Sequence, residues 1–74
     1  MSRLPRVTSK EIIEVLEKEG FFLARQSGSH MIYKNDAGNR TVVPFHAGKT
    51  FPPKTLKSIL RGAHMTVDEL IERL

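Results

Sequence analysis

Residues 21–44, FFLARQSGSHMIYKNDAGNRTVVP, determine the fold that this sequence predicts. Three short runs in this stretch are rich in the aromatic and β-branched residues that favour strands, and turn-forming residues separate them. We therefore predict strands at residues 21–26, 30–34 and 40–43, with Pro44 ending the third. Tight turns at Ser27-Gly28 and across residues 35–39 make both connections hairpins, which predicts a three-stranded antiparallel sheet.

Helices are predicted on both sides of this stretch. Thr8 and Glu11 have the spacing of a capping box, which indicates a helix over about residues 9–19 that stops at Gly20. Two prolines, at 52 and 53, indicate the start of a second helix that runs to about Arg61 and stops at Gly62. The apolar positions of these two helices are Ile12, Ile13, Val15 and Leu16 in the first and Leu56, Ile59 and Leu60 in the second.

A second capping box, Thr66 with Glu69, predicts a short last helix. Its apolar stripe would be Val67, Leu70, Ile71 and Leu74. The order helix, three strands, helix, short helix predicts an α+β fold, α-β-β-β-α with a short C-terminal helix, in which the helices cover one face of the sheet. A chain of 74 residues has room for one small domain, which we take as residues 1–74.

The composition excludes several classes of protein. There is no cysteine, so neither a disulfide framework nor a cysteine-ligated zinc site is expected. No apolar run is long enough to span a membrane or to act as a signal peptide, and we expect a soluble cytoplasmic protein without membrane contacts. Three histidines without nearby paired carboxylates do not predict a metal site, and no other cofactor is expected.

Positive charge is concentrated in the middle of the chain. The net charge is +4, but residues 20–65 alone carry seven lysines and arginines against one acid, Asp36. The first and last predicted helices carry mostly acids. Lys54, Lys57 and Arg61 fall within about 60° of one another on the second helix, at 100° per residue. This segregation indicates an anionic partner such as RNA, although a merely solvated helix face is the common alternative.

His30, in the triplet Gly28-Ser29-His30, is the candidate catalytic residue. RNA can be cleaved without metal when a base takes the proton of the 2′-hydroxyl and nearby cations stabilise the charge that develops on the phosphate. Histidine suits the role of base or acid because it titrates near neutral pH. The alternative is a half-buried strand histidine with one hydrogen bond, and the spacing taken alone favours that structural role.

Other residues are candidates for binding RNA or shaping the site. His46 is a possible second acid or base, with a turn-stabilising loop histidine as the alternative. Gly28 is expected to supply the backbone conformation of the turn. Tyr33 could stack on a base, although packing in the sheet is commoner, and His64 has no evident role. The residues expected to contact RNA are Ser29, Lys34, Arg40, Lys49, Lys54, Lys57 and Arg61.

The central motif resembles that of HicA-type toxins, a family also called YcfA-like. The resemblance is carried by Phe21-Phe22-Leu23-x-Arg25-Gln26-x-Gly28-Ser29-His30-x-x-Tyr33, then by Thr41-Val42-x-Pro44-x-His46, Lys49 and Thr55-Leu56-x-x-Ile59-Leu60. It implies a fold similar to a double-stranded-RNA-binding domain. It further implies a toxin of a type II toxin–antitoxin system that cleaves mRNA, with His30 as the catalytic residue and a HicB-type antitoxin as partner. One departure is Lys54, where family members commonly have glycine.

Two other functions are compatible with a basic surface. A non-catalytic module that binds double-stranded RNA would need the same cations but would not need His30 chemically. A DNA-binding regulator is a third alternative, but the sequence has no clear helix-turn-helix. Cleavage of RNA in excess EDTA that depends on His30 would separate the enzyme from the binding module.

Overall fold

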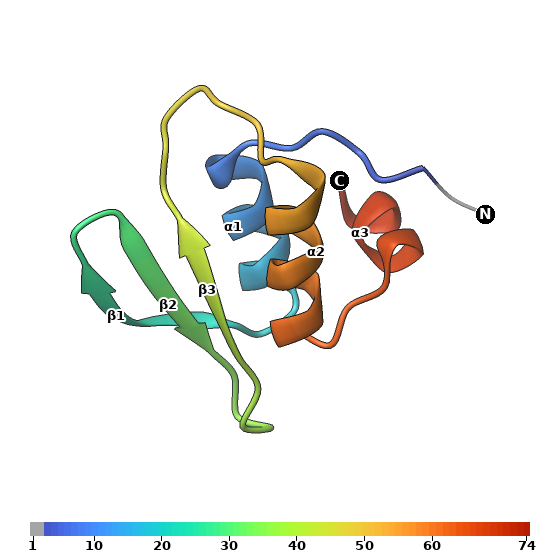
Figure 1. The fold of residues 1–74 in the computed structure, drawn as a ribbon. Helices are drawn as coiled ribbons and strands as arrows, with labels where there is room; N and C mark the ends of the chain where they lie inside the picture. Colours follow the sequence, from blue (N-terminus) through green and yellow to red (C-terminus); the bar gives the residue numbers. More distant parts are fainter. Residues whose placement is uncertain (1–2) are drawn as a thin grey trace.

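The computed structural model describes residues 3–74 and confirms the predicted order of elements. Two helices pack on one side of a three-stranded antiparallel sheet, and a short third helix follows (Figure 1). The elements are α1 (Ser9–Lys18), β1 (Phe22–Ser27), β2 (His30–Lys34), β3 (Arg40–Pro44), α2 (Pro53–Gly62) and α3 (Val67–Arg73). β2 lies between β1 and β3, so both outer strands are sheet edges.

α1 begins and ends as its sequence predicts. The Thr8 side chain accepts a hydrogen bond from the backbone of Glu11, and the Glu11 carboxylate accepts one from the Thr8 backbone, which completes the capping box. Gly20 takes a φ of 89° just after the helix, where a side chain would be strained. Phe21 lies outside β1 and is buried in the core, so the first strand starts one residue later than predicted.

The sheet has one face toward the helices and one face toward solvent. Tyr33 pairs with Thr41 and Met31 pairs with Val43, and these residues face the core. Alternation then places His30, Ile32 and Lys34 on the opposite side, together with their partners Pro44, Val42 and Arg40. We call this side the helix-free face. Pro44 belongs to β3 itself, so the third strand is one residue longer than predicted.

α2 lies along β3 through contacts near the end of the helix. The Thr41 hydroxyl, in a buried side chain, donates a hydrogen bond of 2.8 Å to the carbonyl of Ile59. Gly62 is the last helical residue and not the predicted stop, and its φ is not positive. A Cβ at this position would lie 2.8 Å from the carbonyl oxygen of Arg40, so the glycine allows close contact between α2 and β3.

α3 closes the core beside α1. Leu70 is completely buried, and the Arg73 side chain forms an ion pair with Glu19 at the end of α1. Ile71 and Leu74 are 43% and 53% exposed, so the predicted four-residue apolar stripe is wrong at these two positions.

The segment before α1 is held against the segment before α2. The Val7 carbonyl accepts a hydrogen bond of 3.1 Å from the Phe51 backbone, and Thr8 forms an isolated bridge with Thr50. Val7 and Phe51 are both buried in the core. Residues 3–7 therefore run from the side of α3 across the start of α2 to α1 (Figure 1).

Candidate nucleic-acid interface

His30 is exposed at the first position of β2, directly after a two-residue turn. Ser27 and His30 pair across that turn, and Gly28, at its first central position, has a φ of 58°. This is the position at which a type II′ hairpin requires a positive φ, which explains the glycine. Since the side chain of His30 is exposed, the half-buried structural role considered from spacing does not describe it.

Cations gather on the helix-free face that also carries His30, at the opposite end of β2 from that histidine. Lys34 and Arg40 are directly paired across β2 and β3, and both are exposed. With Arg25, Ala24 and Ile32 they line a shallow hollow on this face. Two predicted RNA-binding residues therefore share a sheet face with the candidate catalytic histidine.

Arg25 belongs to this cationic group, although the sequence did not single it out. Simple alternation would place Arg25 on the same side as Leu23, which pairs with the core residue Tyr33. The register shifts between Leu23 and Arg25, so Arg25 instead pairs with Ile32 and lies on the helix-free face. The sequence shows that Arg25 is charged, but it does not show the β-bulge that turns the side chain of Arg25 onto the helix-free face.

His46 is exposed in the loop after β3, and hydrogen bonds hold this loop beside the turn before His30. The Phe45 backbone donates a hydrogen bond of 2.7 Å to the Ser29 carbonyl, which extends the pairing of β2 and β3 by one step. The His46 backbone donates one of 3.0 Å to the hydroxyl of Ser9, a residue only 1% exposed. Both histidine-bearing segments thus lie at the same end of the sheet.

A second group of cations lies between β3 and α2. Lys54 lines a groove with Val42, Pro44 and Ser58, and Lys49 lines a neighbouring hollow with His46 and Pro44. Pro44 borders both and is the partner of His30. Lys57 and Arg61 are exposed on α2 as predicted, but neither lines these two hollows.

Acidic side chains occupy other elements. α1 exposes Glu11, Glu14 and Glu17, and α3 exposes Asp68 and Glu72. Acidic and basic residues, which are separated along the chain, therefore also lie on different elements of the fold. The three strands and α2 contain no acidic residue and carry Arg25, Lys34, Arg40, Lys54, Lys57 and Arg61, so this surface suits a polyanion.

The remaining candidates lie outside this surface. Tyr33 is 2% exposed, so it packs in the core and cannot stack on a base. Burial raises the pKa of its phenol, and the negative charge of Glu17 adds to the effect. His64 lies in the link between α2 and α3 with a φ of 54°. Across residues 3–74, no three histidine, cysteine, aspartate or glutamate side chains gather to hold a metal ion.

The sequence model of one family, described as "HicA toxin of bacterial toxin-antitoxin", matches residues 9–65, which is well over half of the chain. The chain belongs to the HicA toxin family. No curated protein matches the sequence. Membership in the HicA family identifies the chain as a toxin of a toxin–antitoxin system.

The HicA match covers the elements that carry the candidate site. It begins at the first residue of α1 and ends shortly after α2, and it includes every residue from Ser29 to Arg61 discussed above. The fold resembling a double-stranded-RNA-binding domain, expected from the HicA resemblance, is confirmed by the order and pairing of the elements. Residues 3–8 and α3 lie outside the match. No helix within residues 3–74 has the length and apolar character needed to cross a bilayer.

Proposed function

We propose that this HicA-family toxin is a metal-independent endoribonuclease that cleaves mRNA, with His30 as the catalytic residue. The observation that carries the proposal is the position of His30. Its side chain is exposed at the start of β2, on the same sheet face as Lys34 and Arg40. An RNA strand held by these cations would place a phosphodiester next to an imidazole that can move a proton near neutral pH.

The reaction needs a proton taken from one oxygen and a proton given to another. A base removes the proton of the 2′-hydroxyl, the 2′-oxygen bonds to phosphorus, and the bond from phosphorus to the 5′-oxygen breaks. An acid protonates the departing 5′-oxygen. The products are a 2′,3′-cyclic phosphate and a 5′-hydroxyl, and His30 acts as the base or as the acid.

His46 is proposed as the second proton-transfer group. It is exposed, and its backbone is fixed to Ser9 near the end of β3. The Ser29–Phe45 hydrogen bond keeps its loop beside the turn that presents His30. The cations at Lys34, Arg40, Lys49, Lys54, Lys57 and Arg61, with the Ser29 hydroxyl, are proposed to bind the RNA backbone.

The proposed protein partner is a HicB-type antitoxin. A cell that makes this toxin needs a way to cover either the exposed His30 or the cations around it. An inhibitor with acidic side chains would match the charge of the surface. We expect the antitoxin to cover His30 or the α2 cations, and a complex that leaves both exposed and active would contradict this. We further propose that the toxin acts in the cytoplasm, because its proposed substrate is mRNA.

The decisive experiment compares the wild-type toxin with His30→Ala on a single-stranded RNA in excess EDTA. Loss of one general acid or base lowers the rate roughly 10²- to 10⁴-fold. We expect that loss for His30→Ala, with cyclic-phosphate ends on the wild-type products and unchanged thermal unfolding. The control is His64→Ala, at an exposed histidine on the link between α2 and α3.

Two outcomes would overturn the proposal. Full cleavage by a folded His30→Ala protein would show that another group performs the chemistry. Binding of RNA without any cleavage by the wild-type protein would favour the non-catalytic module for double-stranded RNA. In cells, induced expression of the wild type should stop growth, and His30→Ala should not.

A further inference from the structure

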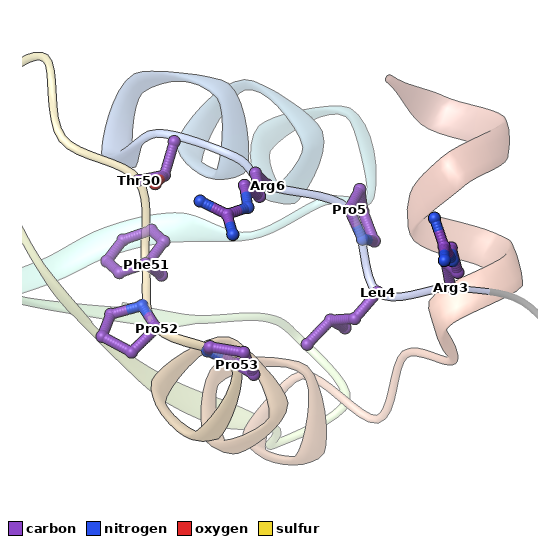
Figure 2. Close-up of a pocket in the computed structure, with 8 residues that line it drawn as sticks. All are labelled: Arg3, Leu4, Pro5, Arg6, Thr50, Phe51, Pro52 and Pro53. Atoms are coloured by element: carbon purple, nitrogen blue, oxygen red, sulfur yellow. The ribbon is translucent and has the colours of Figure 1, made fainter.

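A further hollow lies between residues 3–6 and the start of α2. It has a volume of about 500 Å³ and is lined by Arg3, Leu4, Pro5, Arg6, Thr50, Phe51, Pro52 and Pro53. In Figure 2 the Arg6 guanidinium and the Leu4 side chain extend from the first segment into the space that Phe51 and the prolines border. Arg3 lies at the end of the hollow nearer to α3.

The two arginines of this hollow are available to an anion. Both are exposed, and within residues 3–74 neither forms an ion pair or a side-chain hydrogen bond. Among those residues the ion pairs found all belong to Arg73. An arginine fork can bind a phosphate through two parallel hydrogen bonds.

The rest of the lining is largely apolar. Phe51 is 8% exposed and forms part of the wall, with Leu4 and three prolines around it. A nucleotide combines a phosphate, which the guanidinium groups can hold, with a flat base that can lie on an apolar wall. The volume falls within the range of small-ligand pockets, which is roughly 300–1,000 Å³.

This hollow shares three wall residues with a hollow at the candidate site. Thr50, Phe51 and Pro52 line both this hollow and the neighbouring hollow of about 370 Å³ that His46 and Lys49 line. Pro44 also lines the neighbouring hollow and pairs with His30. The two hollows therefore share one wall, and the second reaches Pro44, the strand partner of His30.

We propose that the hollow at Arg3 and Arg6 binds one further nucleotide of the same RNA strand, flanking the nucleotide that is cleaved at His30. The inference rests on the proposed ribonuclease function and adds a subsite to it. Both arginines lie before the residues that match the HicA family, so this subsite extends the contact surface beyond the matched region. We expect the toxin to prefer RNA that is long enough to occupy both the cleavage position at His30 and the subsite at Arg3 and Arg6.

Binding measurements test the subsite without using cleavage. In the His30→Ala background, Arg3→Gln/Arg6→Gln should weaken binding of a single-stranded RNA of about twelve nucleotides roughly ten- to thirty-fold near 0.1 M salt. The plot of log affinity against log salt should become shallower by about 1.4, since each contact to single-stranded RNA contributes about 0.7. The control Lys10→Gln/Lys18→Gln removes the same charge from α1 and should leave the slope nearly unchanged.

The length of the RNA separates a local subsite from a general loss of charge. Shortening the RNA in single steps should reach a length at which the double variant and its parent bind equally well, because that RNA no longer reaches the hollow. Arg6→Lys should keep the salt slope of the parent and lose part of the affinity, because lysine keeps the charge without the fork.

Several results would overturn the subsite. One is an equal loss of affinity at every RNA length, which would indicate a nonspecific charge effect. Another is unchanged RNA binding together with weaker binding of the cognate antitoxin, which would make the hollow a protein contact. If the double variant binds and cleaves as its parent does while His30→Ala abolishes cleavage, the subsite fails and the ribonuclease proposal stands. If the parent binds no RNA, both fail.

Discussion

The hydroxyl of Ser9 donates a hydrogen bond of 3.1 Å to the carbonyl of Pro44, the residue that pairs with His30 across the sheet. The same hydroxyl oxygen accepts a hydrogen bond of 3.0 Å from the backbone of His46. Ser9 is 1% exposed at the start of α1, so water cannot easily replace either bond. The first turn of α1 thus fixes the backbone on which both candidate catalytic histidines depend.

Ser9→Ala should therefore affect both folding and cleavage. The substitution leaves part-buried backbone groups at Pro44 and His46 without the Ser9 hydroxyl, which costs about 1–3 kcal/mol of the free energy of unfolding. Denaturant titration measures this loss. Single-turnover cleavage should fall more than RNA affinity does, because the change alters the position of the histidines and leaves the cations in place.

Ser58→Ala is the matched control for that experiment. Ser58 is exposed on α2, and removing its hydroxyl should change the free energy of unfolding by less than about 0.5 kcal/mol. If Ser9→Ala is as stable as this control and as active as the wild type, the two hydrogen bonds of Ser9 do not position the site.

Lys54 and Lys57 should contribute unequally to RNA binding, although both are exposed on the same helix. Lys54 borders the groove that Pro44 also lines, and Lys57 does not. Lys54→Gln should therefore weaken RNA binding by the His30→Ala protein more than Lys57→Gln does. If four to six phosphates are contacted, the plot of log affinity against log salt should have a slope of roughly −3 to −4, and Lys54→Gln should reduce it by about 0.7.

Fluorescence anisotropy at several salt concentrations measures these slopes. Lys18→Gln, on α1, removes the same charge and serves as the reference variant. Equal effects at positions 54, 57 and 18 would mean that RNA responds to net charge and not to the groove.

Much of the fold was predictable because its signals are local. Both capping boxes, at Thr8–Glu11 and Thr66–Glu69, involve residues three apart and form as predicted. The hairpins follow from glycine and asparagine turns, and alternation correctly places Ile32 on the same face as His30. The exposure of Lys54, Lys57 and Arg61 also followed from the helical period alone.

The features that sequence reasoning missed depend on contacts between distant residues. The bulge that turns Arg25 onto the helix-free face exists only in the pairing of β1 with β2. The bridging role of Ser9 requires β3 and its loop to meet the start of α1. The sequence predicts that Gly62 ends the helix. In the structure Gly62 instead allows close contact with Arg40 and Thr41 of the sheet. None of these contacts leaves a periodic pattern in the chain.

Tyr33 gives the fold a pH dependence that can be measured directly. Burial raises the pKa of its phenol above the usual 10.0, so the folded state holds this proton more tightly than the unfolded chain does. This contribution to stability is present below pH 10 and is lost as the pH rises through the pKa of the folded state. Unfolding should therefore become easier above pH 10 in the wild type than in Tyr33→Phe.

Ultraviolet absorbance of tyrosinate reports the ionisation without interference, since the sequence has one tyrosine and no tryptophan. The midpoint in the folded protein should lie above that of the protein in denaturant. Identical midpoints in the two states would contradict the burial of the phenol.

Gly62→Ala should destabilise the protein, although alanine is the better helix former. Helix propensity alone would favour alanine by about 1 kcal/mol. However, the new Cβ would lie 2.8 Å from the Arg40 carbonyl oxygen and 2.9 Å from the side chain of Thr41. These atoms belong to the edge strand β3. They cannot move aside without breaking the hydrogen bond between the Thr41 hydroxyl and the Ile59 carbonyl. Overpacking of this kind costs about 1–3 kcal/mol, which outweighs the gain in propensity.

Thermal and denaturant unfolding should therefore show a lower stability for Gly62→Ala than for the wild type. Ser58→Ala, on the same helix, should have almost the stability of the wild type. The strain would also move α2 away from β3, and Lys54 with it, so we expect weaker binding of RNA. Cleavage by His30, on the next strand of the sheet, should be affected less than binding. A Gly62→Ala protein more stable than the wild type would mean that α2 does not lie this close to β3 in solution.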